Sequence, residues 1–341
     1  MSQASRRPPG STDVARLAGV SQKTVSRVMN GEPYVSEAVR ERVLAAAREL
    51  GYRRNTAARA LNLGRFHRIG VVSLGSVLYG PSSTLVWLER RARETGYALS
   101  IVHTLEGQDG SVMAAVDSLL EQGVDGIILS EPIDEGQQLR IEPEVPVLSF
   151  GPTPGIDGPR VVVTGASGVD AGRVATEHLL ALGHATVWHV AGPSQWWAAR
   201  DRISGWRRAL AAAGVAEPPL IEGDWSPASG YAAGRLLATN PEVTAVFVAN
   251  DEMAIGVLRA LAEAGLDVPG RVSVVGMDDI PAAAYLSPPL TTVRQDFEAV
   301  AAYGLKLLVD EIESGAAAAP HDELPAHLVV RESTAPPRET S

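Results

Sequence analysis

Short runs of apolar residues recur after residue 67, and longer stretches rich in Ala, Leu and Arg separate them. The runs read RIGVVSL, YALSIVH, DGIILS, VPVLSF, ATVWHVAG, AVFVAND and VSVVGMDD. Continuously apolar strands are typical of parallel sheets, because helices cover both faces of such a sheet. The runs are numerous enough for two sheets, so we expect an α/β body built of two doubly wound parallel-sheet subdomains.

Polar residues close several of these runs, and ligands in such folds bind at the carboxyl ends of the strands. The residues at these ends are Ser73 and Leu74, Gly192 and Pro193, Asn250 and Asp251, and Asp278 and Asp279. Adjacent residues of a strand point to opposite faces. We therefore expect one of Asp278 and Asp279 to face a cleft and the other to hold the turn.

The composition excludes several classes of protein. The 341 residues include no Cys, which rules out disulfides and thiolate metal sites and is typical of a reducing compartment. No apolar run reaches eighteen residues, and no apolar stretch follows the two Arg of the opening MSQASRRPPG. We therefore expect a cytosolic protein with no membrane span and no secretory signal.

Catalytic patterns are weak. The seven His are scattered, and neither H-E-x-x-H nor G-x-S-x-G is present. The stretch VVVTGASGVDAG, residues 161–172, resembles a dinucleotide-binding turn, but Gly165, Gly168 and Gly172 lack the G-x-G-x-x-G spacing. We expect these glycines to cap a helix at a crossover between the subdomains. We expect no cofactor, no metal and no enzyme activity.

Charge is distributed unevenly along the chain. Residues 1–68 contain 13 Lys and Arg against 5 Asp and Glu, whereas the remainder contains 17 against 35. This asymmetry favours a polyanion-binding module attached to an acidic body. A solvated basic tail would give the same composition, so the charges alone do not decide.

Three short helices are expected within residues 11–53. Their expected starts are Thr12, Ser21 and Ser36, and their expected stops are Gly19, Gly31 and Gly51. In the second helix the apolar Val25, Val28 and Met29 fall on one side. The opposite side is polar and carries Gln22, Lys23, Ser26 and Arg27.

A short turn between the first two helices makes this segment a helix-turn-helix. The polar side of its second helix is chemically suited to the major groove of DNA, because Gln and Lys reach base edges and Arg binds guanine bidentately. A three-helix mini-domain with an ordinary polar face is the alternative that the pattern leaves open.

The N-terminal segment resembles the DNA-binding head of the LacI/GalR family of transcriptional regulators. The match DVA-x-x-AGVS-x-x-TVSRV-x-N runs without a gap from Asp13 to Asn30. The resemblance places base contacts at Ser21, Gln22, Lys23 and Arg27, and the second and third of these choose the operator. It also implies that Thr24, Ser26 and Asn30 contact phosphates or cap helices, which positions the protein without reading sequence.

Residues 53–62 are similar to the hinge helix of that family. The resemblance implies DNA contacts from Asn55, Ala58 and Leu61, with Leu61 wedged between base pairs in the minor groove. Arg54 stands where the family commonly has Pro before the Asn, which weakens the preordering of the hinge. A flexible basic linker is the alternative reading of this segment.

The resemblance extends through the body to about residue 333 and implies an effector cleft between the subdomains. Hydroxyl contacts are implied for Arg202, Asn250 and Asp278, and an aromatic platform for Trp225. The remaining positions that the family pattern places at the cleft are Leu78, Gly80 and Pro81, as a small apolar wall, and Gln295 and Phe297, beside the crossover.

Trp196 and Trp197 are adjacent in a loop after an expected strand. An indole ring stacks well on the C–H face of a sugar, so we expect at least one of the two to line the cleft, with Trp196 as the candidate. The alternative is that one packs in the core and the other covers a helix end. An acid that the family carries after the VPVLSF-type strand has no clear counterpart here, which leaves the exact sugar open.

The expected organisation has five parts: a disordered tail at 1–10, the helix-turn-helix at 11–53, the hinge at 54–66, the effector-binding and dimerisation domain at 67–333, and a disordered tail at 334–341. Within the domain at 67–333, the N-subdomain takes about 67–165 and 297–324, and the C-subdomain about 166–293 and 325–333. The C-terminal HLVVRESTAPPRETS lacks heptad leucines, so we expect a homodimer rather than a tetramer.

The resemblance predicts a repressor that binds palindromic double-stranded operator DNA and is released by a small sugar, a galactoside or a related disaccharide. Operator and sugar would each weaken the binding of the other by the same factor. Three alternatives stay open: a regulator of the same family with the reversed response, a solute-binding protein, and an enzyme fused to a DNA-binding head. The operator, the sugar and the sign of the response are not determined by the sequence.

Overall fold

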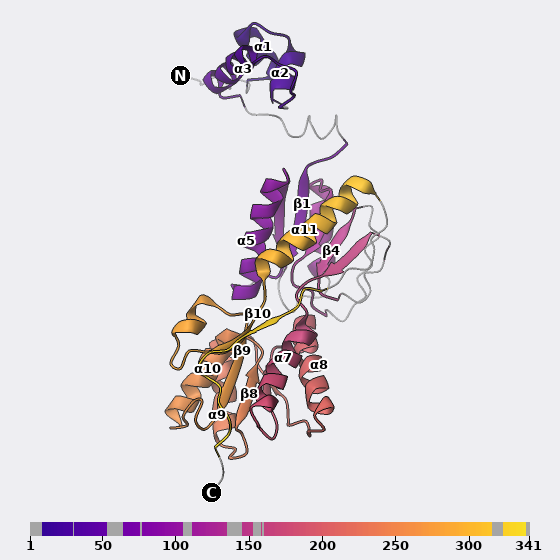
Figure 1. Ribbon diagram of the computed structural model, residues 1–341. Helices are drawn as coiled ribbons and strands as arrows, with labels where there is room; N and C mark the ends of the chain where they lie inside the picture. The colour runs from indigo at the N-terminus through magenta and orange to yellow at the C-terminus, as the bar shows by residue number, and fades with distance from the viewer. Residues whose placement is uncertain are drawn as a thin grey trace, which may run out of the picture. The chain divides into compact units, whose positions relative to one another are not determined.

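The computed structural model describes residues 9–29, 31–52, 64–75, 77–104, 111–134, 145–152, 158, 160–315 and 323–338. The chain divides into two compact units, residues 1–66 and residues 67–341. The first unit carries the small head, and the second carries the α/β body (Figure 1). No helix in the described ranges is long and apolar enough to cross a membrane.

The head contains three helices around a small core. They are α1 (Ser11–Ala18), α2 (Gln22–Met29) and α3 (Glu37–Leu50). Gly19 and Gly51 end the first and third helices at φ of 65° and 62°, in the left-handed region where an L side chain is disfavoured. Val14, Val25 and Val43, one from each helix, have no exposed surface and form the centre of the core.

The first helix begins two residues earlier than expected. Its N-cap is Gly10 rather than Thr12, and the Asp13 carboxylate accepts a hydrogen bond of 2.9 Å from the Gly10 N–H. The helix starts at Ser11 because Asp13, at its third position, reaches back to the backbone that precedes it.

The first sheet of the body has five parallel strands in the order β2-β1-β3-β4-β5. The strands are β1 (Arg68–Ser73), β2 (Ala98–His103), β3 (Gly126–Leu129), β4 (Val147–Phe150) and β5 (Val161–Thr164). Helices α5 (Tyr79–Glu94) and α11 (Phe297–Ser314) cover one face, and α6 (Ser111–Glu121) covers the other. Strands β1, β3 and β4 are short and mostly buried, as the apolar runs predicted, whereas the edge strand β2 is half-buried to exposed.

The second sheet has six strands in the order β11-β10-β9-β8-β6-β7, and only β11 is antiparallel to its neighbour. The strands are β6 (Trp188–Ala191), β7 (Ile221–Glu222), β8 (Ala245–Val248), β9 (Ser273–Met277), β10 (Thr291–Arg294) and β11 (His327–Val329). Helices α7 (Gly168–Ala181) and α8 (Trp197–Ala212) cover one face. Helices α9 (Pro227–Ala238) and α10 (Asp251–Glu263) cover the other, and a 3-10 turn, η1 (Pro281–Tyr285), follows β9.

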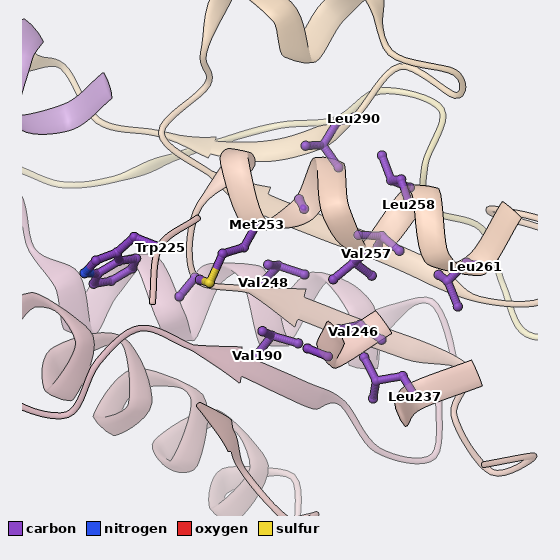
Figure 2. Close-up of a cluster of buried hydrophobic side chains, with 14 of the residues drawn as sticks. Val190, Trp225, Leu237, Val246, Val248, Met253, Val257, Leu258, Leu261 and Leu290 are labelled. Atoms are coloured by element: carbon purple, nitrogen blue, oxygen red, sulfur yellow. The ribbon is translucent and has the colours of Figure 1, made fainter. Parts of the chain in front are cut away.

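The core beneath α9 and α10 is apolar and closely packed (Figure 2). Val246 and Val248 of β8 point toward Val257 of α10 and have no exposed surface. The two helices approach so closely that a Cβ on Gly230 would lie 2.0 Å from the Met253 carbonyl oxygen. Glycine is therefore required at this contact.

The chain crosses between the two sheets three times. The crossings follow β5, follow β10 and precede β11. Two of them are joined by hydrogen bonds, because the Leu324 N–H donates to Gly165 at 2.7 Å and the Ser167 N–H donates to Leu324 at 2.9 Å. The first sheet is therefore completed by α11, and the second sheet by β11.

Residues 334–338 differ from the disordered tail that the sequence predicted. The Ala335 N–H donates to Ser273 Oγ at 3.0 Å, and the Ala335 carbonyl accepts from the same hydroxyl at 2.9 Å. Thr334 bonds to His178 at 3.0 Å. The segment is held because it satisfies buried polar groups beside β9, a role that its Pro-containing composition does not reveal.

Candidate functional site

A cavity of about 140 Å³ lies between the two sheets, at the carboxyl ends of their strands. One ordered water needs roughly 10–15 Å³ of such space, so the cavity is large enough for a small molecule. The nine residues that the family pattern places at the cleft all line it, and so does Trp196, the candidate among the adjacent tryptophans: Leu78, Gly80, Pro81, Trp196, Arg202, Trp225, Asn250, Asp278, Gln295 and Phe297. The fold brings them together from both sheets and from the crossover.

Arg202 and Asp278 form the charged centre of the second-sheet wall. Both side chains are nearly buried, and Nη2 of Arg202 lies 3.8 Å from Oδ1 of Asp278. The Gln295 amide donates to the same carboxylate oxygen at 2.6 Å, and Nη1 of Arg202 donates to the Ala249 carbonyl at 2.5 Å. These bonds fix the carboxylate and the guanidinium in one orientation toward the cavity.

Burial sets the protonation of this pair. It raises the pKa of Asp278 to about 6, although Arg202 and the Gln295 amide both favour the charged carboxylate. Burial also lowers the pKa of Arg202, while Asp278, Asp201 and Asp251 oppose that shift. At neutral pH the pair is therefore ionic and offers oxygens and N–H groups to a polar ligand.

Asp278 and Asp279 separate as the strand geometry predicted. Asp278 faces the cavity, whereas Asp279 forms ion pairs of 2.6 Å with both Arg294 and Arg331. Both aspartates have positive φ, at 105° and 53°, so the backbone turns sharply after β9. The two ion pairs hold this strained turn in place.

Two tryptophans stand side by side in the cavity wall. The rings of Trp196 and Trp225 meet edge to face with centroids 5.6 Å apart, and the Arg202 guanidinium lies 5.1 Å from the Trp225 ring centroid. Trp225 lies at one end of the core cluster, beside Met253 (Figure 2). A Cβ on Gly192 would come within 2.2 Å of the Trp225 ring, so Gly192 makes room for it.

Trp197 lies outside the cavity lining, although it is adjacent to Trp196. Its ring packs under the Arg200 guanidinium, which lies 4.4 Å from the ring centroid. Of the two adjacent tryptophans, the structure therefore brings only Trp196 into the described lining.

The side chain of Asn250 is largely used within the fold. Its carbonyl oxygen accepts from the Met253 N–H at 2.8 Å and caps α10. Its amide donates to the Trp225 carbonyl and to Glu252, both at 3.0 Å. The expected contact from Asn250 to a ligand stays a prediction, and the structure adds that Asn250 positions Trp225.

The wall on the first-sheet side is mainly apolar. It is formed at the N-termini of α5 and α11, where Leu78, Gly80 and Pro81 face Phe297. The Phe297 ring meets Tyr79 edge to face at 5.8 Å. A Cβ on Gly80 would lie 3.5 Å from the Phe297 ring, an ordinary contact, so the glycine widens the cavity rather than relieving a clash.

Sequence reasoning missed several residues of the lining, including four carboxylates. The carboxylates are Glu131, Asp201, Glu252 and Glu323, and other members are Thr84, Ser130, Phe150 and Val300. Glu131 is the second residue after β3, so the strand-end rule could have found it. Asp201 lies within α8 and Glu323 in a crossover, and neither position carries a sequence signal.

Contacts across the cavity join the two halves of the body on opposite sides. On one side Asp134 forms a 2.9 Å ion pair with Arg200, and its N–H donates to the Gln195 carbonyl at 2.8 Å. On the other side the Tyr79 N–H donates to Glu252 at 3.3 Å. The described structure is therefore a closed arrangement of the two subdomains.

The glycines of residues 161–172 serve packing rather than a dinucleotide. Ser167 caps α7 through the Asp170 N–H at 3.2 Å, so the cap is a serine and not one of the expected glycines. A Cβ on Gly172 would lie 2.2 Å from the Arg202 carbonyl oxygen. This glycine is needed because α7 and α8 pack in close contact.

The polar face of α2 is exposed, as the pattern predicted. Val25 and Val28 are buried, whereas Gln22, Lys23, Ser26 and Arg27 are exposed. Ser21 Oγ accepts from the Thr24 N–H at 3.0 Å and bonds to the Thr24 hydroxyl at 2.8 Å, which caps the helix.

Two contacts restrain this face before DNA is bound. The Gln22 amide donates to Ser11 Oγ at 2.8 Å, and Arg27 pairs with Glu32 at 3.5 Å. The predicted contacts at Asn30, Asn55, Ala58 and Leu61 lie outside the described residues. The described ranges hold no group of three or more acidic or His side chains that could bind a metal.

Two family models match the chain. Residues 12–55 match the lacI family of bacterial regulatory proteins, and residues 176–334 match a periplasmic binding protein-like domain. The lactose operon repressor of Escherichia coli K12 is 36% identical over 331 residues, which cover 95% of this chain and 90% of that protein. The regulator CelR of Thermobifida fusca is 35% identical over 341 residues, covering 96% and 99%.

Solved structures of such proteins share the fold. A crystal structure of the Lac repressor dimer bound to operator and to the anti-inducer ONPF matches with a TM-score of 0.85, 34% identity and coverage of 96% of this chain and 100% of that one. A complex of CelR with cellobiose matches with a TM-score of 0.71 and 34% identity, covering 95% and 99%. The chain belongs to the lacI family of bacterial regulatory proteins.

Proposed function

We propose that this protein is a homodimeric repressor that binds a palindromic operator through α2 and is released by a small sugar bound in the cavity between its sheets. A galactoside or a related disaccharide is the first candidate for the sugar. The protein acts as a regulator and not as an enzyme. The palindrome follows from the two-fold symmetry of a dimer that carries two heads.

The observation that carries the proposal is the composition of the cavity. Two tryptophan rings, an ionic Arg202–Asp278 pair and an amide from Gln295 meet in one lining. Aromatic rings pack against the C–H face of a sugar, and fixed carboxylate, guanidinium and amide groups exchange hydrogen bonds with its hydroxyls. Pockets of this type bind small ligands through an apolar body and a few placed polar groups.

Two similar proteins support both halves of the proposal. The Lac repressor was solved as a dimer on its operator, and CelR was solved with cellobiose. The exposed polar face of α2 supplies the side chains that read base edges in a helix-turn-helix. Contacts from Gln22 and Arg27 to bases would replace their present bonds to Ser11 and Glu32.

The link between sugar and operator is a shared equilibrium between two arrangements of the subdomains. The closed arrangement depends on contacts such as the Asp134–Arg200 ion pair and the Tyr79–Glu252 hydrogen bond. A ligand shifts this equilibrium only if it binds one arrangement more tightly. A coupling of about 1–3 kcal/mol, typical of such systems, changes operator affinity about 5- to 150-fold.

The test is fluorescence anisotropy on the purified full-length chain. The first step selects a labelled duplex from a library of randomised palindromes with a central CG step, at fixed salt. The second step adds galactosides and glucosides, including lactose and cellobiose, and measures release. We expect selective binding and release by at least one sugar of the panel.

Three outcomes would contradict the proposal in different places. Selective DNA binding that no sugar changes would contradict the assignment of the cavity. Tighter DNA binding on addition of a sugar would keep the cavity and reverse the sign, making the sugar a co-repressor. Turnover of any panel sugar, followed by chromatography, would contradict the non-enzymatic assignment.

A further inference from the structure

The cavity carries an excess of negative charge. Among its described lining residues the one cation is Arg202, and the carboxylates are Glu131, Asp201, Glu252, Asp278 and Glu323. Three of the five carboxylates have a clear role in the fold. Asp278 pairs with Arg202 at 3.8 Å. Glu131 and Glu252 accept backbone N–H bonds from Leu74 at 2.9 Å and from Tyr79 at 3.3 Å.

Asp201 and Glu323 have no such role. Neither makes a hydrogen bond or an ion pair within the described ranges. Burial and the nearby charge of Glu323 raise the pKa of Asp201, and Arg202 and Arg208 compensate only in part. The two carboxylates therefore repel each other at the edge of a cavity without a counter-charge of their own.

Two structural explanations for this pair fail. The first explanation is that Asp201 stabilises the N-terminus of α7, because a Cβ on Gly168 of that helix would lie 2.8 Å from the Asp201 Cβ. The Ser167 side chain already caps this helix, however, and Asp170 already supplies an acidic residue in its first turn. A metal site needs more ligands, and the described residues contain no suitable group of three. The pair is thus available to a ligand of the cavity.

A second, independent feature of the cavity also points to a ligand. Nε of Arg202 and Nε1 of Trp225 are buried donors that lack a partner in the described structure, and both residues line the cavity. An unpaired buried donor costs roughly 1–3 kcal/mol. The ring and hydroxyl oxygens of a sugar are acceptors that would satisfy these donors. The second-sheet wall is therefore suited to a polyhydroxylated ligand.

We infer that the ligand of this cavity is an amino sugar, whose protonated amine lies between Asp201 and Glu323 and whose hydroxyls face Arg202 and Asp278. This inference rests on the proposed function and narrows its class of sugar. It also predicts exclusion of sugar acids and sugar phosphates. The five carboxylates of the described lining outnumber its one cation, Arg202, which already lies 3.8 Å from Asp278, so an anionic ligand would meet net repulsion.

The experiment is isothermal titration of the full-length chain at pH 7 with matched sugars. The pairs are D-galactosamine with D-galactose and D-glucosamine with D-glucose, together with the uncharged N-acetyl derivatives and D-galactose 6-phosphate. An amine with a pKa near that of an α-amino group, about 7.7–8.0, is mostly protonated at this pH. We expect the amine of one pair to bind at least tenfold more tightly than its parent, about 1.4 kcal/mol, and the phosphate to bind more weakly.

Two variants assign the preference to the acidic pair. Asp201→Asn and Glu323→Gln should each reduce the ratio of the two dissociation constants toward one, because each variant weakens binding of the amine more than binding of its neutral parent. Glu323 is exposed, so its substitution does not threaten the fold. The matched control is Glu242→Gln, an exposed carboxylate before β8 at the opposite end of the strands, which should keep the full preference. A higher salt concentration should weaken binding of the amino sugar more than binding of its neutral parent.

The outcomes separate the inference from the proposed function. Equal or weaker binding of the amines, with the neutral sugars bound, would overturn the inference and leave a sugar-responsive regulator. A preference for amines that survives both Asp201→Asn and Glu323→Gln would also overturn it. Absence of binding by every sugar of the panel would overturn the inference and the proposed cavity together.

Discussion

The two walls of the cavity have opposite chemistry. The first-sheet wall is mainly apolar, with Leu78, Gly80 and Pro81 against Phe297, and its polar members are Thr84, Ser130 and Glu131. The second-sheet wall carries the Arg202–Asp278 pair and the edge-to-face tryptophans. The difference predicts that one wall would fix the orientation of a bound ligand through directed hydrogen bonds, whereas the other would exclude water and limit the size of the ligand.

The walls also differ in how their residues are held. The polar groups lie at strand ends and bond to one another, as Gln295 does to Asp278 and Asn250 to the Trp225 carbonyl. The apolar groups lie at the N-termini of α5 and α11, where the Phe297 ring packs edge to face on Tyr79. We therefore expect changes in the polar wall to cost more affinity than changes in the apolar wall.

The largest effect should come from Arg202→Ala. The change removes charged hydrogen bonds worth about 1.5–3 kcal/mol each and leaves Asp278 buried without its partner. We expect sugar affinity to fall about 100-fold by titration, and release of the operator to be lost, while operator affinity without sugar changes less than about threefold. Arg207→Ala, an exposed arginine of the same helix, is the control. Normal release by the Arg202 variant would show that the polar wall does not bind the sugar.

A smaller effect should follow Trp225→Phe. The ring and its contact with Trp196 are partly kept, but the Nε1–H donor and some stacking area are lost. Aromatic contacts contribute about 0.5–1.5 kcal/mol beyond area, so we expect a 3- to 10-fold weaker sugar affinity. Trp197→Phe, outside the cavity lining, should leave the affinity unchanged. Equal effects of the two changes would contradict the stacking role of Trp225.

Gly80→Ala tests the apolar wall. The new methyl group makes only an ordinary contact with Phe297 at 3.5 Å, so the fold should tolerate it. Because it fills space beside the sugar, we expect aryl galactosides to lose about 3- to 10-fold in affinity and methyl galactosides to change little, measured by competition titration. Ser83→Ala on the same helix is the control. Equal losses for both ligands would mean that this wall does not receive the aglycone.

The smallest effect concerns pH. Because burial raises the pKa of Asp278 to about 6, its carboxyl is protonated below that pH and accepts hydroxyl bonds poorly. A bound sugar that favours the carboxylate should therefore bind a few-fold more tightly at pH 7 than at pH 5. Between about pH 3.8 and pH 6 this carboxyl is ionised in the unfolded chain but still protonated in the folded protein. The free energy of unfolding therefore falls as pH rises through this range.

Asp278→Asn distinguishes this carboxyl from Asp201 and Glu252, whose pKa values burial also raises. The variant should bind the sugar more weakly at pH 7 and lose the step in affinity near pH 6. A step that persists in the variant would assign the titration to another group.

Local signals explain how much of the molecule was predictable. Ser21 and Gly51 mark helix ends through caps that depend on neighbouring residues alone, so the head was predicted almost to the residue. The apolar runs predicted the central strands for the same reason. The strands β7 and β11, of 2 and 3 residues, were not predicted because so few residues carry no pattern.

The cavity was predictable where the family motif names a residue and not where tertiary contact decides. Arg202, Trp225 and Asp278, which the motif names, all line the cavity. It did not reveal that the Asn250 amide donates to the Trp225 carbonyl, or that Asp201 of α8 and Glu323 of a crossover line the same cavity. Such roles depend on which distant segments the three crossings bring together.

The crossings also set the order in which the protein can fold during synthesis. The core of the first sheet includes Leu305, Leu308 and Ile312 of α11, which leave the ribosome after β6 to β10 have been made. Helix α5 covers its part of that face early, but the part that α11 covers, with Leu148, therefore stays exposed while most of the second sheet emerges. Exposed apolar strands of this kind are prone to aggregate. A nascent chain of this topology is therefore expected to be most prone to aggregation before α11 has been made.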